Sequence, residues 1–257
     1  MKQYTVATAP LIRGQFAVDD LICFNETLHS IDAVSEAELL EHLDLRREVI
    51  ETCLKMNADG INQGTSGNVS VRCDEGFLIT ASGIVYDKMK PAHVIEMDLE
   101  GNYRGDYLPS TEWRMHMDIF RARPEAKAIV HVHSTYATAL ACLRREVPAF
   151  HYMIGVTGGT SLRVSDYAEF GTQELSDTML KAMEGRTGCL LANHGQICFG
   201  PSLAKALWLA GEIEHLCHQY WAAGLAGKPV ILDEAQMASV LKRFKTYGKQ
   251  AGDMVKG

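Results

Sequence analysis

The first long pattern of hydrophobic positions in the chain has the spacing of an α-helix. Hydrophobic residues recur on one face between residues 39 and 54, and they follow Ser35-x-x-Glu38, where serine and glutamate have the spacing of a capping box. Gly60 supplies a stop signal shortly after the last of them. The pattern predicts a long amphipathic helix over about residues 36–57.

Shorter hydrophobic runs further along the chain are typical of β-strands. The runs at residues 69–71, 77–80 and 94–97 predict part of an antiparallel sheet, with a turn at Glu100-Gly101-Asn102. Later patterns predict a helix that opens at Ser110, a strand at 128–133, a helix at 134–143, two strands between 188 and 199, and helices at 202–225 and 233–247. The chain is therefore expected to be an α/β protein whose sheet is flanked by helices.

Composition and charge exclude several classes of protein. A chain of 257 residues that is 47% hydrophobic and 22% charged is long enough for one large α/β domain. Its net charge of −7 and its lack of a long basic run do not fit a nucleic-acid partner. No unbroken hydrophobic stretch follows Met1 or occurs later, so we expect neither a signal peptide nor a membrane-spanning helix.

The cysteines indicate the compartment. The chain contains seven of them, an odd number, and they are widely scattered without any C-x-x-C pair. This pattern fits reduced thiols better than a disulfide framework. We therefore expect a cytoplasmic protein.

Two histidines in one predicted strand have the spacing of metal ligands. Side chains alternate along residues 129–133, so His131 and His133 share one face of the strand. A catalytic zinc ion usually takes three protein ligands, and the candidate for the third is His194, which lies at the end of a hydrophobic run and before a glycine. By spacing alone, a metal site and a chance pair of histidines both remain open.

Three predicted loops carry the groups that bind a phosphate dianion. Residues 64–68, 80–83 and 109–111 offer hydroxyl groups, glycine backbone and one amide. Each loop taken alone also fits an ordinary turn or helix cap. Glu112 follows the third loop at the predicted start of a helix, where a carboxylate also fits as a charge that stabilises the helix dipole. None of the loops has a nucleotide-binding fingerprint, so any phosphorylated ligand is expected to be small.

Four segments of the chain together resemble the class II aldolase/adducin family. They are residues 62–72, Ser110-Thr111-Glu112-Trp113-Arg114, His131-Val132-His133 and Asn193-His194-Gly195. The resemblance runs from about residue 44 to residue 248 and implies a three-layer α/β sandwich with a central, mostly antiparallel sheet flanked by helices. About forty N-terminal residues have no counterpart in the compact aldolases. We therefore divide the chain into an N-terminal extension, residues 1–34, and a catalytic domain, residues 35–257.

The resemblance also implies roles for individual residues. His131, His133 and His194 would hold one zinc ion per subunit, or another divalent ion in its place. Glu112 would be the catalytic acid/base and could also touch the metal, and Tyr152 would donate a proton. The residues implied to bind the sugar phosphate are Gly67, Asn68, Ser82, Gly83, Ser110, Thr111, Phe170 and Tyr247. The last two would reach the site from a neighbouring subunit of a homotetramer whose active sites lie at subunit interfaces.

The implied reaction is the retro-aldol cleavage of a ketose 1-phosphate. L-Fuculose 1-phosphate or a similar substrate would give dihydroxyacetone phosphate and a small aldehyde such as L-lactaldehyde. The same scaffold also carries metal-dependent decarboxylases and sugar-phosphate 4-epimerases, and the match around Tyr152 and Tyr247 favours the aldolase. A non-catalytic, adducin-like interaction module is disfavoured because the three histidines and Glu112 are all present.

The chain departs from the family pattern at three positions. Ala81-Ser82 replaces a usual Pro-Thr, Thr111 replaces a serine, and Asn193 stands where many relatives have a histidine. The first two changes keep a hydroxyl group. The histidines that we expect to be packing or surface residues outside the site are His116, His215 and His218.

Overall fold

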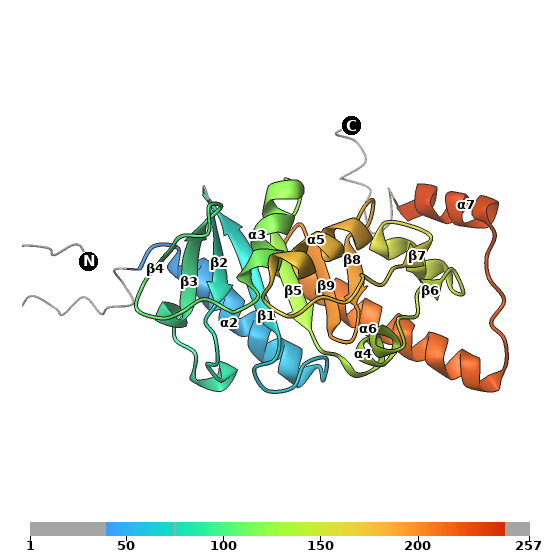
Figure 1. Cartoon of the computed structure of the whole chain (residues 1–257), viewed down its shortest axis with the longest axis horizontal. Helices are drawn as coiled ribbons and strands as arrows, with labels where there is room; N and C mark the ends of the chain where they lie inside the picture. Colours follow the sequence, from blue (N-terminus) through green and yellow to red (C-terminus); the bar gives the residue numbers. More distant parts are fainter. Residues whose placement is uncertain (1–39, 75, 245–257) are drawn as a thin grey trace, which may run out of the picture. The chain divides into compact units, whose positions relative to one another are not determined.

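The computed structural model describes residues 40–74 and 76–244, which contain a seven-stranded sheet (Figure 1). The strands lie in the order β4-β3-β2-β1-β5-β9-β8, and every neighbouring pair is antiparallel. Their bounds are β1 Asn68–Cys73, β2 Gly76–Thr80, β3 Val94–Asp98, β4 Tyr103–Arg104, β5 Ala128–Val132, β8 Gly188–Leu191 and β9 Gly195–Gly200. A second sheet pairs β6 (Val147–Pro148) with β7 (Ser161–Leu162). The predicted, mostly antiparallel central sheet is confirmed.

Helices pack on both faces of the large sheet and make it the middle of three layers (Figure 1). The helices on one face are α2 (Leu43–Ala58), α4 (Thr135–Cys142) and α6 (Leu203–Ala226), and those on the other are α3 (Trp113–Ala122) and α5 (Gln173–Ala182). Alternate side chains of each strand enter two separate hydrophobic cores. Val130 and Val132 of β5 lie in the core with α2, α4 and α6, whereas Ile129 lies in the core with α3 and α5. Because both faces are buried, a shift of one residue would exchange the two sets, and this specifies the register.

Helix α2 begins later than the hydrophobic pattern predicts. It spans Leu43–Ala58 rather than residues 36–57, and residues 40–42 are not helical. His42 has a φ of 60°, in the left-handed region that a right-handed helix does not contain. The hydrophobic spacing therefore extends to residues on the N-terminal side of the first helical residue. Both the capping box and the proposed domain boundary between residues 34 and 35 lie outside the described residues.

The later helices lie close to their predicted positions. α6 agrees with the helix predicted over residues 202–225, and α7 (Glu234–Phe244) agrees with the one predicted over 233–247 as far as the described residues extend. Helix α5 and the small sheet are elements that the hydrophobic pattern did not predict. The side chain of Thr172 caps α5 by accepting a hydrogen bond of 3.2 Å from a backbone N–H of its first turn.

The described cysteines are free thiols. Cys142 is exposed, and the buried ones are Cys53, Cys73, Cys189, Cys198 and Cys217. Burial raises the pKa of the Cys73 thiol to about 11, so this group stays protonated at neutral pH. Free thiols are what the scattered cysteine pattern predicts for this part of the chain.

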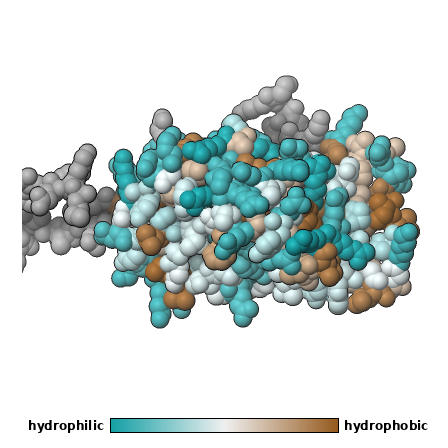
Figure 2. Space-filling view, in the orientation of Figure 1, coloured by the Kyte–Doolittle hydropathy of each residue, from teal (hydrophilic) through white to brown (hydrophobic). Residues whose placement is uncertain are grey.

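The face of the molecule drawn in Figure 2 is mostly hydrophilic, and several of its hydrophobic residues lie toward the end that carries α7. Hydrophobic side chains with large exposed fractions occur in the last turns of α6 and in the segment that follows it. Leu225 is 71% exposed and Val230 is 87% exposed. Among the helices of the described residues, none combines the length and the hydrophobicity that crossing a bilayer requires.

Candidate active site

Strand β5 and the turn between β8 and β9 bring three histidines together. His131 lies in β5 and His133 follows directly after it, and both project toward the face covered by α3 and α5, as the alternation predicted. β5 pairs with β9, and His194 lies in the turn directly before β9. Gly195 is required at this crossing, because a Cβ there would lie only 2.6 Å from the carbonyl oxygen of Val132 and 2.8 Å from the His133 ring.

The turn that carries His194 is held in place by α4. Asn193 has a φ of 54°, a left-handed conformation that asparagine tolerates better than most residues. Its backbone N–H donates to the carbonyl of Ala141 at 3.1 Å, and its side-chain oxygen accepts from Arg144 Nε at 3.0 Å. Asparagine therefore has a structural role at this position.

The three imidazole rings surround one point. Their centroids lie 4.9 Å apart for His131 and His133, and 4.8 Å apart for each pair that includes His194. The rings are close to perpendicular to one another, with interplanar angles of 70° to 76°. One nitrogen from each ring and one carboxylate oxygen of Glu112 all lie within 4.8 Å of one another. This is the arrangement of a compact metal-binding cluster.

The carboxylate of Glu112 completes this cluster. Its Oε2 lies 3.1 Å from Nε2 of His131, and its Oε1 lies 3.1 Å from Nε2 of His194. Oε1 is buried, and none of the described groups meets it with hydrogen-bond geometry. A buried carboxylate oxygen without a donor is costly unless a cation or a ligand faces it.

The hydrogen bonds of His131 show which of its nitrogens is free. Its Nδ1 lies 2.8 Å from the carbonyl oxygen of Gln196, and a carbonyl can only accept, so Nδ1 carries the proton. When the ring carries only this proton, Nε2 presents a lone pair toward Glu112 and His133, which also present acceptors. Such a set of converging lone pairs is stable around a cation, and the four residues therefore fit a divalent metal ion.

The protonation states of the cluster agree with this donor set. Burial opposes ionisation of Glu112, but the facing imidazoles of His131 and His194 outweigh it and hold the pKa of the carboxyl far below its usual range. Burial, together with the nearby imidazoles of His131 and His194, lowers the pKa of His133 to about 4. At neutral pH, Glu112 is ionised and His133 is neutral, and these are the forms that bind a metal.

A cavity of about 300 Å³ opens beside the cluster. It is lined by Ser66, Thr111, Glu112, His133, Tyr167, Ala168, Phe170, Asn193 and His194. Phe170 lines the cavity from the same chain as the cluster, whereas the resemblance implied that it reaches the site from a neighbouring subunit. Ser66, Tyr167 and Ala168 were not predicted. The hydroxyl of Ser66 lies in the first predicted phosphate loop and could have been included on that basis.

The structure brings some of the other predicted phosphate-binding residues next to Glu112. Asn68 donates from its side-chain amide to Glu112 Oε2 at 3.0 Å, and the hydroxyl of Ser110 accepts from the Glu112 backbone N–H at 3.3 Å. Ser82 and Gly83 are exposed, and the backbone of Ser82 is tied to Leu108 on the neighbouring loop. They do not line the cavity.

Gly67 is a buried packing position under the histidines. A Cβ there would lie 2.6 Å from the carbonyl oxygen of His131 and 2.6 Å from the side chain of Asn62. The residue therefore lets β1 approach β5 closely, which is a structural reason for glycine in addition to the predicted contact with phosphate.

The predicted proton donor, Tyr152, is not brought to the cavity of its own chain. Tyr152 begins the 3-10 helix η3 (Tyr152–Thr157), where it is half exposed and its ring is 6.4 Å from that of Phe244 in α7. It is not among the residues that line the cavity. Tyr247 lies outside the described residues.

The three histidines that were expected to lie outside the site differ from one another. His215 and His218 are exposed on α6 and contact Gln219 and Tyr136, so the expectation that they are surface residues holds. His116 is completely buried, and both of its ring nitrogens make hydrogen bonds. The helical spacing of four residues from Glu112 was the only sequence signal for its position.

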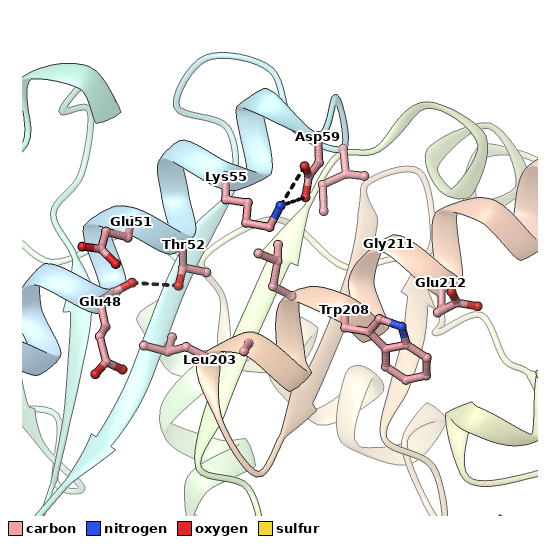
Figure 3. A pocket seen from close by; sticks show the side chains of 12 residues that line it. Glu48, Glu51, Thr52, Lys55, Asp59, Leu203, Trp208, Gly211 and Glu212 are labelled. Carbon is pink, nitrogen blue, oxygen red and sulfur yellow. Dashed lines mark hydrogen bonds and ion pairs between the residues drawn. The ribbon is translucent and has the colours of Figure 1, made fainter. Parts of the chain in front are cut away.

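A larger groove between α2 and α6, of about 530 Å³, is a poor site for a phosphorylated ligand (Figure 3). Its walls carry four carboxylates, those of Glu48, Glu51, Asp59 and Glu212. The single lysine, Lys55, pairs with Asp59 at 3.0 Å. The surplus of negative charge would repel a phosphate dianion. The groove contains no histidine or cysteine, so the chemistry is concentrated in the smaller cavity.

Comparison with known proteins agrees with this site. A sequence model of the class II aldolase and adducin N-terminal domain matches residues 47–221. The chain is 47% identical to a 5-methylthioribulose-1-phosphate/5-deoxyribulose-1-phosphate aldolase of Rhodospirillum rubrum over 207 residues, which cover 80% of this chain and 94% of the relative. It is 45% identical to an L-fuculose phosphate aldolase of Escherichia coli K12 over 210 residues, which cover 81% and 98%.

A solved structure has the same fold. The structure of an L-fuculose 1-phosphate aldolase superposes with a TM-score of 0.77 at 40% identity, and the match covers 79% of this chain and 96% of that one. The match of the family domain extends over more than half of the chain, and it includes all four residues of the cluster. The chain therefore belongs to the class II aldolase and adducin family.

Proposed function

We propose that this chain is a metal-dependent aldolase that cleaves a ketose 1-phosphate to dihydroxyacetone phosphate and a small aldehyde. The observation that carries the proposal is the cluster of His131, His133, His194 and Glu112, in which the buried Oε1 of Glu112 has no hydrogen-bond partner among the described groups. The curated relatives with 45% and 47% identity are named as aldolases of sugar 1-phosphates. A non-catalytic module would not need this donor set.

The proposed reaction moves two protons and breaks one carbon–carbon bond. The C4 hydroxyl of the substrate loses its proton, the bond between C3 and C4 breaks with its electron pair moving toward the C2 carbonyl, and C3 gains a proton. A divalent ion held by the three histidines, which we propose to be zinc, would supply a Lewis acid for the negative charge that develops at C2. Glu112 moves the proton at C3, since it lines the cavity and its Oε1 has no hydrogen-bond donor among the described groups. Tyr152 exchanges the proton of the aldehyde oxygen.

The cavity also suggests how the substrate is held. The hydroxyls of Ser66 and Thr111 line it, and the backbone and hydroxyl of Ser110 lie directly behind Glu112, so we place the phosphate on this side. The hydrophobic wall formed by Tyr167, Ala168 and Phe170 suits an aldehyde that ends in a methyl or methylthio group. L-Fuculose 1-phosphate and a 5-deoxy or 5-methylthio ribulose 1-phosphate all meet these requirements.

Release of dihydroxyacetone phosphate tests the proposed function, because all three substrates yield it. Zinc-loaded protein should release it from at least one of them, a chelator should abolish release, and added zinc should restore it. Comparison of kcat/KM among L-fuculose 1-phosphate, 5-deoxyribulose 1-phosphate and 5-methylthioribulose 1-phosphate then identifies the preferred substrate. Epimerisation of ribulose 5-phosphate or release of CO₂ from a sugar acid, without release of dihydroxyacetone phosphate, would instead indicate the epimerase or decarboxylase functions of the same scaffold.

We also propose that the active enzyme is a cytoplasmic homotetramer in which Tyr152 serves the active site of a neighbouring subunit. Tyr152 does not line the cavity of its own chain, and it contacts α7, the helix that follows the exposed hydrophobic residues Leu225 and Val230 in the sequence. Exposed hydrophobic residues of this kind favour contact with a second protein surface. A site that takes residues from two copies requires assembly.

Mixing two inactive variants measures this sharing of sites. Glu112→Gln and Tyr152→Phe chains, unfolded together and refolded in equal amounts, should regain about a quarter of the wild-type activity, because about one site in four combines an intact Glu112 with an intact Tyr152 from the neighbour. The control is the same mixture refolded separately and then combined. Activity no higher than the mean of the two variants would show that both residues act within one chain.

A further inference from the structure

A series of buried hydrogen bonds connects His116, in the interior of α3, to Glu112. The reaction proposed above assigns no role to these hydrogen bonds. His116 lies one turn after Glu112 and is fully buried. Its Nδ1 is 2.6 Å from the hydroxyl of Ser70, and its Nε2 is 2.5 Å from the side-chain oxygen of Asn68. The amide nitrogen of Asn68 in turn donates to Oε2 of Glu112 at 3.0 Å. All four residues are at most 5% exposed, so these hydrogen bonds are shielded from water.

Two of these residues stand on one strand next to the histidines. Asn68 and Ser70 are two positions apart on β1, so both side chains project toward α3. In the sheet, Asn68 is the direct partner of His131 on β5. The hydrogen-bonded chain therefore joins α3, β1 and the metal-binding cluster through fixed backbone positions.

The Glu112 carboxylate determines which group donates and which accepts in each of these hydrogen bonds. The Glu112 carboxylate accepts hydrogen bonds, so Asn68 must present its NH₂ group to it and its oxygen to His116. His116 must then donate from Nε2, which leaves Nδ1 to accept from the Ser70 hydroxyl. Burial lowers the pKa of His116 to about 3, so the ring is neutral and has one donor and one acceptor. Each donor meets one acceptor without a conflict.

We propose that His116 is a positioning residue, which holds the Asn68 amide with its NH₂ group toward Glu112 and thereby leaves Oε1 of Glu112 as the oxygen that faces the reaction. The inference rests on the proposed aldolase function. Without the Nε2 donor, the amide could reverse and place its oxygen against the carboxylate. Because Oε2 contacts Asn68 and His131 while Oε1 has no hydrogen-bond donor, the amide determines which carboxylate oxygen is free.

Two variants of His116 separate positioning from packing. His116→Leu removes the donor at similar size and should lower kcat by about tenfold to a hundredfold, with KM and bound zinc unchanged. His116→Gln can again offer an N–H to Asn68 and should recover most of the loss. In an Asn68→Ala background, His116→Leu should cause no further fall in kcat, because both residues act through the same contact.

The matched control is Ser176→Ala. Ser176 is also fully buried against α3, where its hydroxyl donates to Asp118 at 2.7 Å, but its contacts do not lead to Glu112. The Ser176→Ala protein should be less stable than the wild type but should keep the wild-type kcat per folded molecule. The proposal is wrong if His116→Leu behaves like Ser176→Ala, if its effect is confined to KM or to the amount of bound zinc, or if its loss adds fully to that of Asn68→Ala.

A spectroscopic measurement keeps this test apart from the test of function. In protein labelled with ¹⁵N-histidine, the signal that disappears in His116→Gln should belong to a neutral ring protonated at Nε2. A neutral ring protonated at Nδ1 would overturn the proposal, since Asn68 would then have to turn its oxygen toward Glu112. This result does not depend on activity, whereas a wild-type protein that releases no dihydroxyacetone phosphate from any of the three substrates contradicts only the proposed aldolase function.

Discussion

Replacing His194 by alanine is expected to remove most of the bound metal and to lower kcat/KM for the preferred sugar phosphate on the order of 10³-fold, as follows from losing several kcal/mol of charge stabilisation. His194 is the histidine best suited to this experiment. Its side chain is 12% exposed, and its Nε2 faces Glu112 at 3.1 Å. His131, in contrast, is fully buried and bonded to the Gln196 carbonyl, so its replacement would also disturb the core.

The measurement combines metal analysis of the dialysed protein with steady-state kinetics. His215→Ala is the matched control, because His215 is an exposed histidine on α6 whose ring contacts only the neighbouring Gln219, at 2.8 Å, among the described groups. The control should keep both its metal and its activity. A His194→Ala protein with a full complement of zinc would remove His194 from the set of ligands.

Glu112→Gln should lower kcat by about 10²- to 10⁴-fold while the protein retains most of its zinc. The amide has nearly the same size and can still offer an oxygen to the metal, but it cannot take up and return a proton at C3. Exchange of the C3 protons of dihydroxyacetone phosphate with solvent deuterium isolates this step, since no aldehyde is needed. The exchange rate should fall by the same factor as the cleavage rate.

The control for Glu112→Gln is a second buried carboxylate on the same helix. Asp118 is 7% exposed and accepts hydrogen bonds from Ser176 at 2.7 Å and from Gln173 at 2.6 Å, away from the cavity. Asp118→Asn should destabilise the protein without changing deuterium exchange per folded molecule. If Glu112→Gln exchanged the C3 protons at the wild-type rate, another group would have to be the base.

The two variants together distinguish binding of the metal from proton transfer. Loss of His194 should reduce metal content and activity together, and added zinc should restore neither fully. Loss of the Glu112 carboxylate should reduce activity in protein that still holds zinc. If both variants lost their zinc alike, Glu112 would be mainly a metal ligand, and the proton at C3 would need a different carrier.

Local sequence patterns predicted most of the regular structure. The period of two along residues 129–133 placed His131, in β5, and His133, directly after it, on one face before any contact was known, because side chains alternate along an extended chain. The hydrophobic pattern also located β1, β2, β3, α6 and most of α2. It failed at His42, whose left-handed backbone delays the start of α2 to Leu43, since hydrophobic spacing carries no information on a single φ angle.

The sequence by itself determined which chemical groups are available: three histidines, one glutamate at a helix start, and loops rich in hydroxyls and glycine. Only the tertiary structure decided which of them meet. His194 reaches His131 through the pairing of β5 with β9, and His116 reaches Glu112 through Asn68 on β1. Such contacts join residues 44 to 65 positions apart in a single hydrogen bond, as between Asn68 and Glu112 or His131 and Gln196. They depend on strand register and helix packing, which arise from burial on both faces of the whole sheet rather than from any local pattern.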